Sequence, residues 1–250
     1  MSEEKPDEPA LIVERDGAIL VLTLNRPATR NALDAAIATG LREALASFSE
    51  DDELLVCVLT GADGCFSSGL DLKELSEQGT ETSLALKRLM RQGSPKPMIA
   101  AIEGYALAGG FELALTCDLI VASREASLGL PEVRRMLVAN SGGLLRLPPR
   151  IGYQAAAEIA LTGEPVAAER LYGLGLVNRL VEPGEALAAA LELASRIAEG
   201  GSLAAIRATK EILALAAPAD HWARQDAVAD GFFESSDAKA AAKRFLTRHE

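Results

Sequence analysis

One stretch, from Lys96 to Glu132, most constrains the fold of this chain, because it combines two buried strands with a glycine pair at a helix start. Pro97–Ile102 is a short apolar run typical of a buried strand, and Asp118–Ala122 is a second one. Between them, Gly109-Gly110 precede a helical pattern over Phe111–Thr116. A strand that leads through glycine into a helix start points unpaired backbone N–H groups outward, with the positive end of the helix dipole behind them.

Two glutamates belong to the same stretch. Glu112 falls in the first turn of the predicted helix, and Glu132 follows a proline after the second strand. Either glutamate alone would be an ordinary residue that favours the dipole at a helix start. Together with the glycine pair, they predict a site that stabilises an anion and contains an acid/base pair.

A second glycine-rich turn follows the apolar strand predicted at Leu54–Thr60. In GADGCFSSGLDL (61–72) the glycines do not fit GxGxxG, and no Walker Lys-Ser/Thr follows, so neither type of nucleotide-binding loop is supported. The simplest interpretation is an ordinary turn in which serine caps a helix. It is nevertheless the second place where a buried strand ends in glycine and backbone amides. If the two turns converge, they supply two N–H donors to one oxygen.

Strand and helix patterns alternate along the chain and predict an α/β fold. Asp16-Gly17 predicts a hairpin between β runs at 10–15 and 18–25, and Asn31 is expected to cap the following helix. Further expected elements are helices at 84–91, 153–161 and 167–172, a turn at Gly104-Tyr105, a loop at 138–149, a strand-like segment at 175–181, and helices at 185–199, 203–216, 220–234 and 237–248. We therefore expect a disordered N-terminus at 1–9, an α/β core at 10–184 and a helical region at 185–250.

Charge and composition exclude several classes of function. A net charge of −11 argues against general nucleic-acid or anionic-membrane binding. The apolar runs are too short for a membrane span, and the acidic start MSEEKPDEPA predicts no signal peptide. Three cysteines, two of them within apolar strand-like runs, are typical of buried thiols in a reducing compartment. A cytoplasmic location is expected.

Several catalytic chemistries lack their residues. With only His221 and His249, a histidine-based metal cluster has few ligands, and no metal site is expected. No GxSxG nucleophile elbow is present, and Cys65 has no basic neighbour in sequence to activate it. General acid–base chemistry by carboxylates remains, with backbone amides stabilising a developing anion.

Five segments resemble the enoyl-CoA hydratase/isomerase (crotonase) superfamily. They are NRPATRNAL (25–33), GCFSSGLDL (64–72), KPMIAAIEGYALAGGFELALTCDLIVAS (96–123), ASLGLPEV (126–133) and SGGLLRLP (141–148). They occur in the family's order and spacing, and the resemblance covers about residues 10–248. The block at 104–132 is the most specific of them.

The resemblance implies a crotonase-like spiral of ββα turns, with a C-terminal helical region that packs a homotrimer, often as a dimer of trimers. It implies an oxyanion hole made by the backbone N–H groups of Leu70 and Gly109. The two glutamates of the family's hydratases fall on Glu112, which would activate water, and Glu132, which would protonate C2. No cofactor is implied, because coenzyme A is part of the acyl-CoA substrate.

The resemblance also implies a set of substrate-binding residues around the adenine and pantetheine of CoA: Arg26, Arg30, Ser68, Asp71, Leu72, Lys73 and Asn140. The three basic residues would meet phosphates locally, with simple surface solvation as the alternative. Asn140 marks a departure, because many hydratases have Pro-Gly-Ala-Gly-Gly-Thr-Gln after the second glutamate. Here 139–145 reads ANSGGLL, which is closer to the carnitinyl-CoA dehydratase branch.

The leading hypothesis is therefore an enoyl-CoA hydratase, a hydro-lyase that adds water across the C2=C3 bond of a 2-enoyl-CoA or removes it. Alternatives within the family are a carnitinyl-CoA-like dehydratase and a Δ3-Δ2 enoyl-CoA isomerase, which needs only one proton-shuttling carboxylate. A different class is a non-catalytic acyl-CoA-binding scaffold, which would keep the glycines without needing both glutamates.

Overall fold

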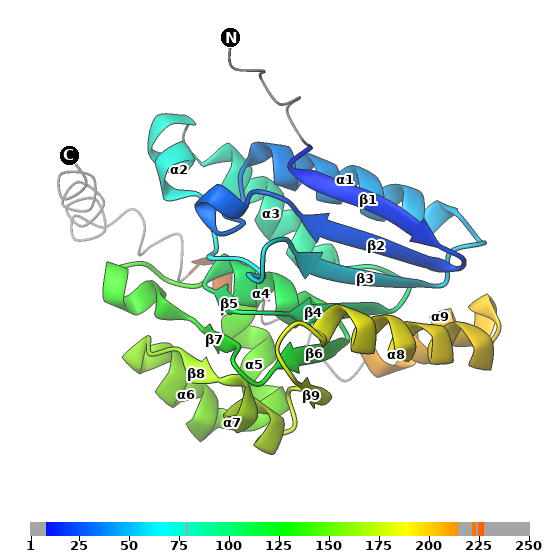
Figure 1. Ribbon diagram of the computed structural model, residues 1–250. Helices are drawn as coiled ribbons and strands as arrows, with labels where there is room; N and C mark the ends of the chain where they lie inside the picture. Colours follow the sequence, from blue (N-terminus) through cyan, green and yellow to red (C-terminus); the bar gives the residue numbers. More distant parts are fainter. Residues whose placement is uncertain (1–8, 79, 215–221, 224, 228–250) are drawn as a thin grey trace, which may run out of the picture.

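A six-stranded, mostly parallel sheet is the centre of the fold (Figure 1). The computed structural model describes residues 9–78, 80–214, 222–223 and 225–227. The sheet has the order β1 (Leu11–Asp16), β2 (Ile19–Leu24), β3 (Val56–Gly61), β4 (Met98–Ile102), β6 (Leu119–Ser123) and β9 (Arg179–Val181). β1 and β2 form the predicted antiparallel hairpin, and the remaining pairs are parallel. The predicted α/β class is confirmed.

Both faces of the sheet are covered, which explains the nearly continuous apolar sequence of its strands. In β3, Val56 and Val58 face one hydrophobic cluster, whereas Cys57 and Leu59 face the other. The first cluster is closed by α8 (Ala186–Gly200), whose small residues are buried at intervals of one helical turn, at Ala186, Ala190 and Ala194. Figure 1 shows α8 crossing beside β4 and β6 on that side.

The remaining helices follow the chain around the other face and the ends of the sheet. They are α1 (Ala35–Glu50), α2 (Leu72–Gln78), α3 (Glu81–Gln92), α4 (Gly109–Thr116), α5 (Gly143–Ile151), α6 (Tyr153–Thr162), α7 (Ala168–Gly173) and α9 (Leu203–Ala214), with 3-10 turns η1 (Pro27–Thr29) and η2 (Pro131–Arg135). Within the described residues, no helix is long and apolar enough to cross a membrane.

A second, three-stranded sheet joins the two glycine turns that the sequence singled out. It consists of β5 (Tyr105–Leu107), β7 (Ser127–Gly129) and β8 (Val166–Ala167). β5 also forms a parallel bridge between Ala106 and Ser67, which lies in the turn that follows β3. This bridge holds the turn after β3 beside the turn that precedes α4.

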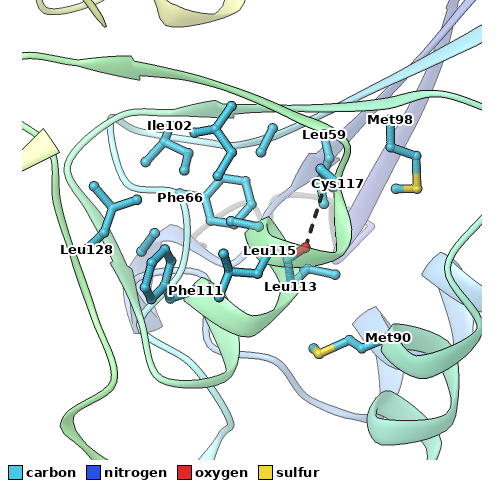
Figure 2. Packing of buried hydrophobic residues seen from close by; sticks show 14 of the residues in the cluster. Leu59, Phe66, Met90, Met98, Ile102, Phe111, Leu113, Leu115, Cys117 and Leu128 are labelled. Carbon is cyan, nitrogen blue, oxygen red and sulfur yellow. Dashed lines mark hydrogen bonds between the residues drawn. The ribbon is translucent and has the colours of Figure 1, made fainter. Parts of the chain in front are cut away.

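The larger core cluster lies directly behind these two turns. Figure 2 shows the rings of Phe66 and Phe111 packed among Ile102 and Leu128, and all four side chains are fully buried. Phe66 lies within the turn that follows β3, and Phe111 lies in the first turn of α4, just after Gly109-Gly110. Close packing of this core therefore fixes both turns from behind, because a well-packed interior resists small displacements.

The structure corrects three expectations about secondary structure. The N-cap of α1 is Asp34, whose Oδ1 accepts from Ile37 N at 2.9 Å, and not Asn31. Asn31 is fully buried in a left-handed conformation (φ 53°). Its amide donates to Ala62 O and Cys65 O, so it serves as a link between loops.

The loop expected at 138–149 is replaced from Gly143 onward by α5, which contains Pro148 and Pro149. The two prolines lie in the last turn of α5, which ends at Ile151 with Gly152 as its C-cap. Tyr105 likewise begins β5 and is not part of a turn. The disorder predicted for 1–9 and the helices predicted over 220–234 and 237–248 lie almost entirely outside the described residues.

Candidate active site

A cavity of about 500 Å³ brings together the four residues predicted to carry the chemistry. Leu70, Gly109, Glu112 and Glu132 all line it. The surrounding wall comes from α2, α3, η2 and the segment that precedes α5. These elements are distant in sequence. In the cavity, the glycine-rich turns that contain Leu70 and Gly109 lie beside Glu112 and Glu132.

The backbone N–H groups of Leu70 and Gly109 converge on one side of the cavity. A Cβ placed on Gly109 would lie only 3.5 Å from Leu70 N. The backbone of Leu33 forms hydrogen bonds with both neighbours of Leu70: Leu33 N donates to Gly69 O, and Leu33 O accepts from Asp71 N. Gly109 is the first residue of α4. In the described part of the chain, neither of these two amides donates a hydrogen bond to a protein acceptor. Both are therefore available to an oxygen in the cavity.

The two turns approach each other too closely for a side chain at Gly69. Gly69 has φ +99°, and a Cβ there would be 2.9 Å from both Ala108 Cβ and Leu107 O. Ala108 itself adopts a left-handed φ of 50° with ψ −127°, an uncommon conformation for a residue with a side chain. Its N–H bonds Gly129 O of β7 at 2.9 Å. The small sheet thus holds a strained residue directly before the Gly109 amide, as functional sites often do.

Glu112 is a buried carboxylate held by two backbone amides. Its Oε1 accepts from Ser141 N at 2.8 Å and from Gly143 N at 2.9 Å. Burial raises the pKa of Glu112 to about 7, although these two hydrogen bonds and the nearby Arg146 favour the ionised form. Glycine at position 143 favours this contact, because a Cβ there would lie 3.0 Å from Glu112 Cγ and would displace the carboxylate side chain. Both backbone N–H bonds fall on Oε1, and Glu112 lines the cavity in which a ligand would lie.

Glu132, in η2, has a different environment. Its Oε2 is buried and has no hydrogen-bond partner among the described residues. Burial, together with repulsion from Glu112, raises the pKa of Glu132 to about 8. Burial and mutual repulsion disfavour ionisation of both carboxyl groups together, and the two backbone N–H bonds make Glu112 the carboxyl that is more easily ionised. Two carboxyl groups with separated pKa values supply one base and one acid.

The predicted CoA-binding residues fall into two groups. Ser68, Leu72 and Asn140 line the cavity. Arg26, Arg30, Asp71 and Lys73 are not among the described residues that line it. Arg26 forms ion pairs with Asp34 at 3.0 Å and Asp71 at 2.9 Å, and it donates to Ala32 O. Asp71 also caps α2 by accepting from the N–H groups of Lys73 and Glu74.

Several residues of the site were missed by sequence reasoning. Ser67 is fully buried, donates to Asn31 O at 2.8 Å and accepts from Gly69 N, which orients the first amide turn. Ser141 and Gly143 hold Glu112 from 29 and 31 residues away along the chain. The glycine pair 142–143 before α5 was a usable signal, because it repeats the pattern at 109–110.

Basic residues also border the cavity. Lys87 of α3 and Arg135 of η2 are among its lining residues. The guanidinium of Arg146 in α5 donates to Ser141 O and Met90 O behind the wall, and burial lowers its pKa to about 10. No group of three or more potential metal-binding His, Cys, Asp or Glu residues occurs in the described portion of the chain.

Comparisons with known proteins agree with this arrangement. A family model described as enoyl-CoA hydratase/isomerase matches residues 14–249. A mevalonyl-coenzyme A hydratase of Aspergillus fumigatus is 42% identical over 199 residues, which are 77% of this chain and 73% of the relative. Two solved structures from mycobacteria are also similar.

The first is an enoyl-CoA hydratase from Mycobacterium tuberculosis H37Rv, with 46% identity and a TM-score of 0.78 over 96% of this chain and 97% of that one. The second is a carnitinyl-CoA hydratase from Mycobacterium avium, with 36% identity and a TM-score of 0.87 over 96% of this chain and 97% of that one.

Proposed function

Because the chain belongs to the enoyl-CoA hydratase/isomerase family, we propose that it adds water across the C2=C3 bond of a 2-enoyl-CoA thioester or removes it in the reverse direction. The predicted family resemblance and the crotonase-like α/β fold are confirmed by the match over residues 14–249 and by the similar solved structures. The observation that carries the proposed reaction is one cavity lined by two carboxyl residues and two available amides.

The amides of Leu70 and Gly109 would bind the thioester oxygen. Addition of water at C3 moves the electrons of the C2=C3 bond toward the carbonyl and creates an enolate on that oxygen. Two preorganised N–H donors stabilise this charge without reorganisation, and the loss of one such donor costs roughly 10²–10³ in rate. Because only the amide acts, the leucine side chain at position 70 is compatible with the role.

The two glutamates would move the protons. Glu112, the more readily ionised carboxyl, takes a proton from water as the water oxygen forms its bond to C3. Glu132, the more readily protonated one, gives its proton to C2 as the enolate collapses. One proton passes from water to Glu112 and one passes from Glu132 to C2, so the net addition of water is balanced. A proton that then moves from Glu112 to Glu132 through water restores the starting protonation of the two glutamates.

Two carboxyl groups favour hydration over the alternatives. A Δ3-Δ2 isomerase moves one proton between carbons and needs one shuttling carboxylate. A non-catalytic acyl-CoA scaffold has no use for a buried pair whose desolvation opposes folding. Dehydration of a carnitinyl-type thioester is the same chemistry in reverse, and it remains within the proposal.

The cavity wall and the relatives support a compact acyl group with a polar substituent. Leu72, Leu84 and Met90 form an apolar surface that also includes the polar Ser83 and Asn140. One relative is named for mevalonyl-CoA and one similar structure for carnitinyl-CoA. We infer that Asn140 contacts such a substituent, and that Arg30 and Lys73, which are exposed, meet CoA phosphates.

An activity panel tests the proposal. The purified protein is assayed with unsubstituted 2-enoyl-CoA thioesters of increasing chain length, and with mevalonyl-CoA and carnitinyl-CoA in the dehydration direction. We expect catalysed hydration or dehydration of at least one short or polar acyl-CoA of the panel. The reaction is monitored by the loss or gain of the absorbance of the conjugated thioester. Tight acyl-CoA binding without turnover on any member would instead favour the scaffold hypothesis.

A further inference from the structure

Three residues near the C-terminus, Trp222, Gln225 and Asp226, contact the wall of the proposed active site from outside. Gln225 Nε2 donates to Asn140 O at 2.9 Å. Asp226 forms ion pairs with Lys87 at 2.9 Å and Arg91 at 2.7 Å, both from α3. The guanidinium groups of Arg91 and Arg146 each lie 4.9 Å from the centre of the Trp222 ring.

Gln225 forms its hydrogen bond with the same peptide group, Asn140–Ser141, whose N–H donates to the Glu112 carboxylate. Asn140 C=O and Ser141 N–H belong to one peptide plane. The C=O accepts from Gln225 at 2.9 Å, and the N–H donates to Glu112 Oε1 at 2.8 Å. A hydrogen bond at the carbonyl end fixes the orientation of the plane and polarises the N–H at the other end. Gln225 is thereby linked to the proposed base through a single peptide.

The side-chain oxygen of Gln225 gives no comparable stabilisation. Gln225 Oε1 is buried, and the described residues provide no donor for it. A buried polar atom without a partner costs free energy. An apolar residue of similar size would avoid this cost if Gln225 were there only to pack. Its Nε2 donor is the feature that distinguishes it from such a residue.

We propose that Gln225 is a positioning residue for Glu112, which orients and polarises the Asn140–Ser141 peptide so that the N–H of Ser141 stabilises the Glu112 carboxylate. The inference rests on the proposed role of Glu112 as the base. Trp222 and Asp226 support the same contact, because they hold residues next to Gln225 against α3 and against Arg146, which donates to Ser141 O.

Other charges act on Glu112 and stay in place when Gln225 is changed. Glu132 of η2 opposes ionisation of its neighbour, while Arg146 of α5 favours it. Lys87 and Arg91 of α3 are partly balanced by Asp226. A substitution at Gln225 that introduces no charge therefore tests the orientation of the Asn140–Ser141 peptide, because the charged groups around Glu112 stay the same.

Gln225→Met is the test, because methionine keeps the length of glutamine and removes the donor. We expect the pKa of Glu112 to rise by about one unit, which corresponds to about a tenfold smaller ionised fraction in the acid range. The acid limb of the kcat/KM profile should move upward by the same amount. The protonated Glu112 carboxyl can be followed without activity by its infrared C=O absorption, assigned by its loss in Glu112→Gln.

Gln154→Met provides the matched control, because Gln154 is exposed on α6. It should leave both the infrared midpoint and the pH profile unchanged. An unchanged midpoint in folded Gln225→Met would overturn the inference, whatever the change in Tm. If that variant does not fold, Gln225→Leu is measured in the same way. An inactive wild type would reject the proposed function, while the infrared midpoint would still decide the role of Gln225.

Discussion

Glu132 has a higher pKa than Glu112, about 8 against about 7, although both side chains face one cavity. Burial raises both pKa values, repulsion from Glu112 adds to that of Glu132, and the two carboxyl groups differ in hydrogen bonding. Oε1 of Glu112 accepts two backbone N–H bonds, whereas Oε2 of Glu132 is buried without a partner in the described structure. The two backbone hydrogen bonds favour the ionised form of Glu112, as the base proposed above requires, and Oε2 of Glu132, unpartnered among the described residues, favours its protonated form, as the proposed acid requires.

The raised pKa values predict a pH-dependent stability. Folding raises the pKa of Glu132 from 4.5 to about 8 through burial. The stability that the protonated Glu132 side chain contributes to the folded state is therefore fully present below pH 4.5 and is lost as pH rises through about 8. Glu132→Gln should therefore be more stable than wild type at about pH 9 by several kcal/mol, with an upper bound of roughly 5 kcal/mol from the size of the pKa shift. At about pH 4 the difference between the two should be much smaller. Denaturant unfolding at both pH values checks this, and a constant difference would contradict it.

The close approach of the two amide turns predicts a specific effect of Gly69→Ala. The new Cβ would meet Ala108 Cβ and Leu107 O at 2.9 Å and push the amides of Leu70 and Gly109 apart. Turnover should fall roughly 10²–10³-fold, the cost of losing an oxyanion donor.

Gly64→Ala is the control for that substitution, because Gly64 has a similar left-handed φ of +67° but nothing within 4 Å of its Cβ position. Both variants should lose stability from backbone strain, measured by thermal unfolding. Only Gly69→Ala should lose turnover. Equal activity of the two variants would show that the geometry of the amide pair does not limit the reaction.

Sequence patterns and the family resemblance singled out four residues that line one cavity, but not the residues that hold them in place. The strand–glycine–helix pattern indicated Glu112 and the glycine pair at 109–110, because the chemistry of a helix start depends on neighbouring residues, whereas the family resemblance was needed to single out the amide of Leu70. The donors to Glu112 come from Ser141 and Gly143, and such long-range pairings have no local signal.

Misassigned capping and loop residues have equally physical causes. Asn31 and Asp34 are both typical N-cap residues, and only the tertiary fold shows that Asn31 is buried between loops while Asp34 caps α1. Pro148 and Pro149 usually end helices, yet α5 continues to Ile151. The role of Gln225 depends on a contact with a residue 85 positions earlier.

Asn140→Gly should change substrate preference and not the reaction. Asn140 lines the cavity, and its backbone carbonyl, which binds Gln225, is retained in glycine. Loss of the side-chain amide should lower kcat/KM for a polar acyl-CoA relative to an unsubstituted short-chain enoyl-CoA. A change of roughly tenfold in the ratio is expected for one lost hydrogen bond. If the ratio stays the same, Asn140 acts only in the loop.

Exposed apolar residues on α9 favour an oligomer, which the family resemblance implies is built from trimers. Ile212 and Leu213 are 67% and 71% exposed, on a helix that follows the alanine-rich α8. Such residues are normally covered when they form part of a larger apolar surface. Light scattering at micromolar concentration should give three or six times the 26.3 kDa of one chain. A monomeric mass would refute this prediction.

The turnover of Glu112→Gln and Glu132→Gln, measured beside acyl-CoA affinity, tests the central claim most directly. Each substitution keeps the shape of the side chain and removes one proton-transfer group, so turnover should fall by roughly 10²–10⁴. The Kd for acyl-CoA should stay within a few-fold of wild type, and the exposed control Glu125→Gln should match wild type in both. Wild-type-like hydration by either active-site variant would contradict the assignment of the two glutamates as base and acid.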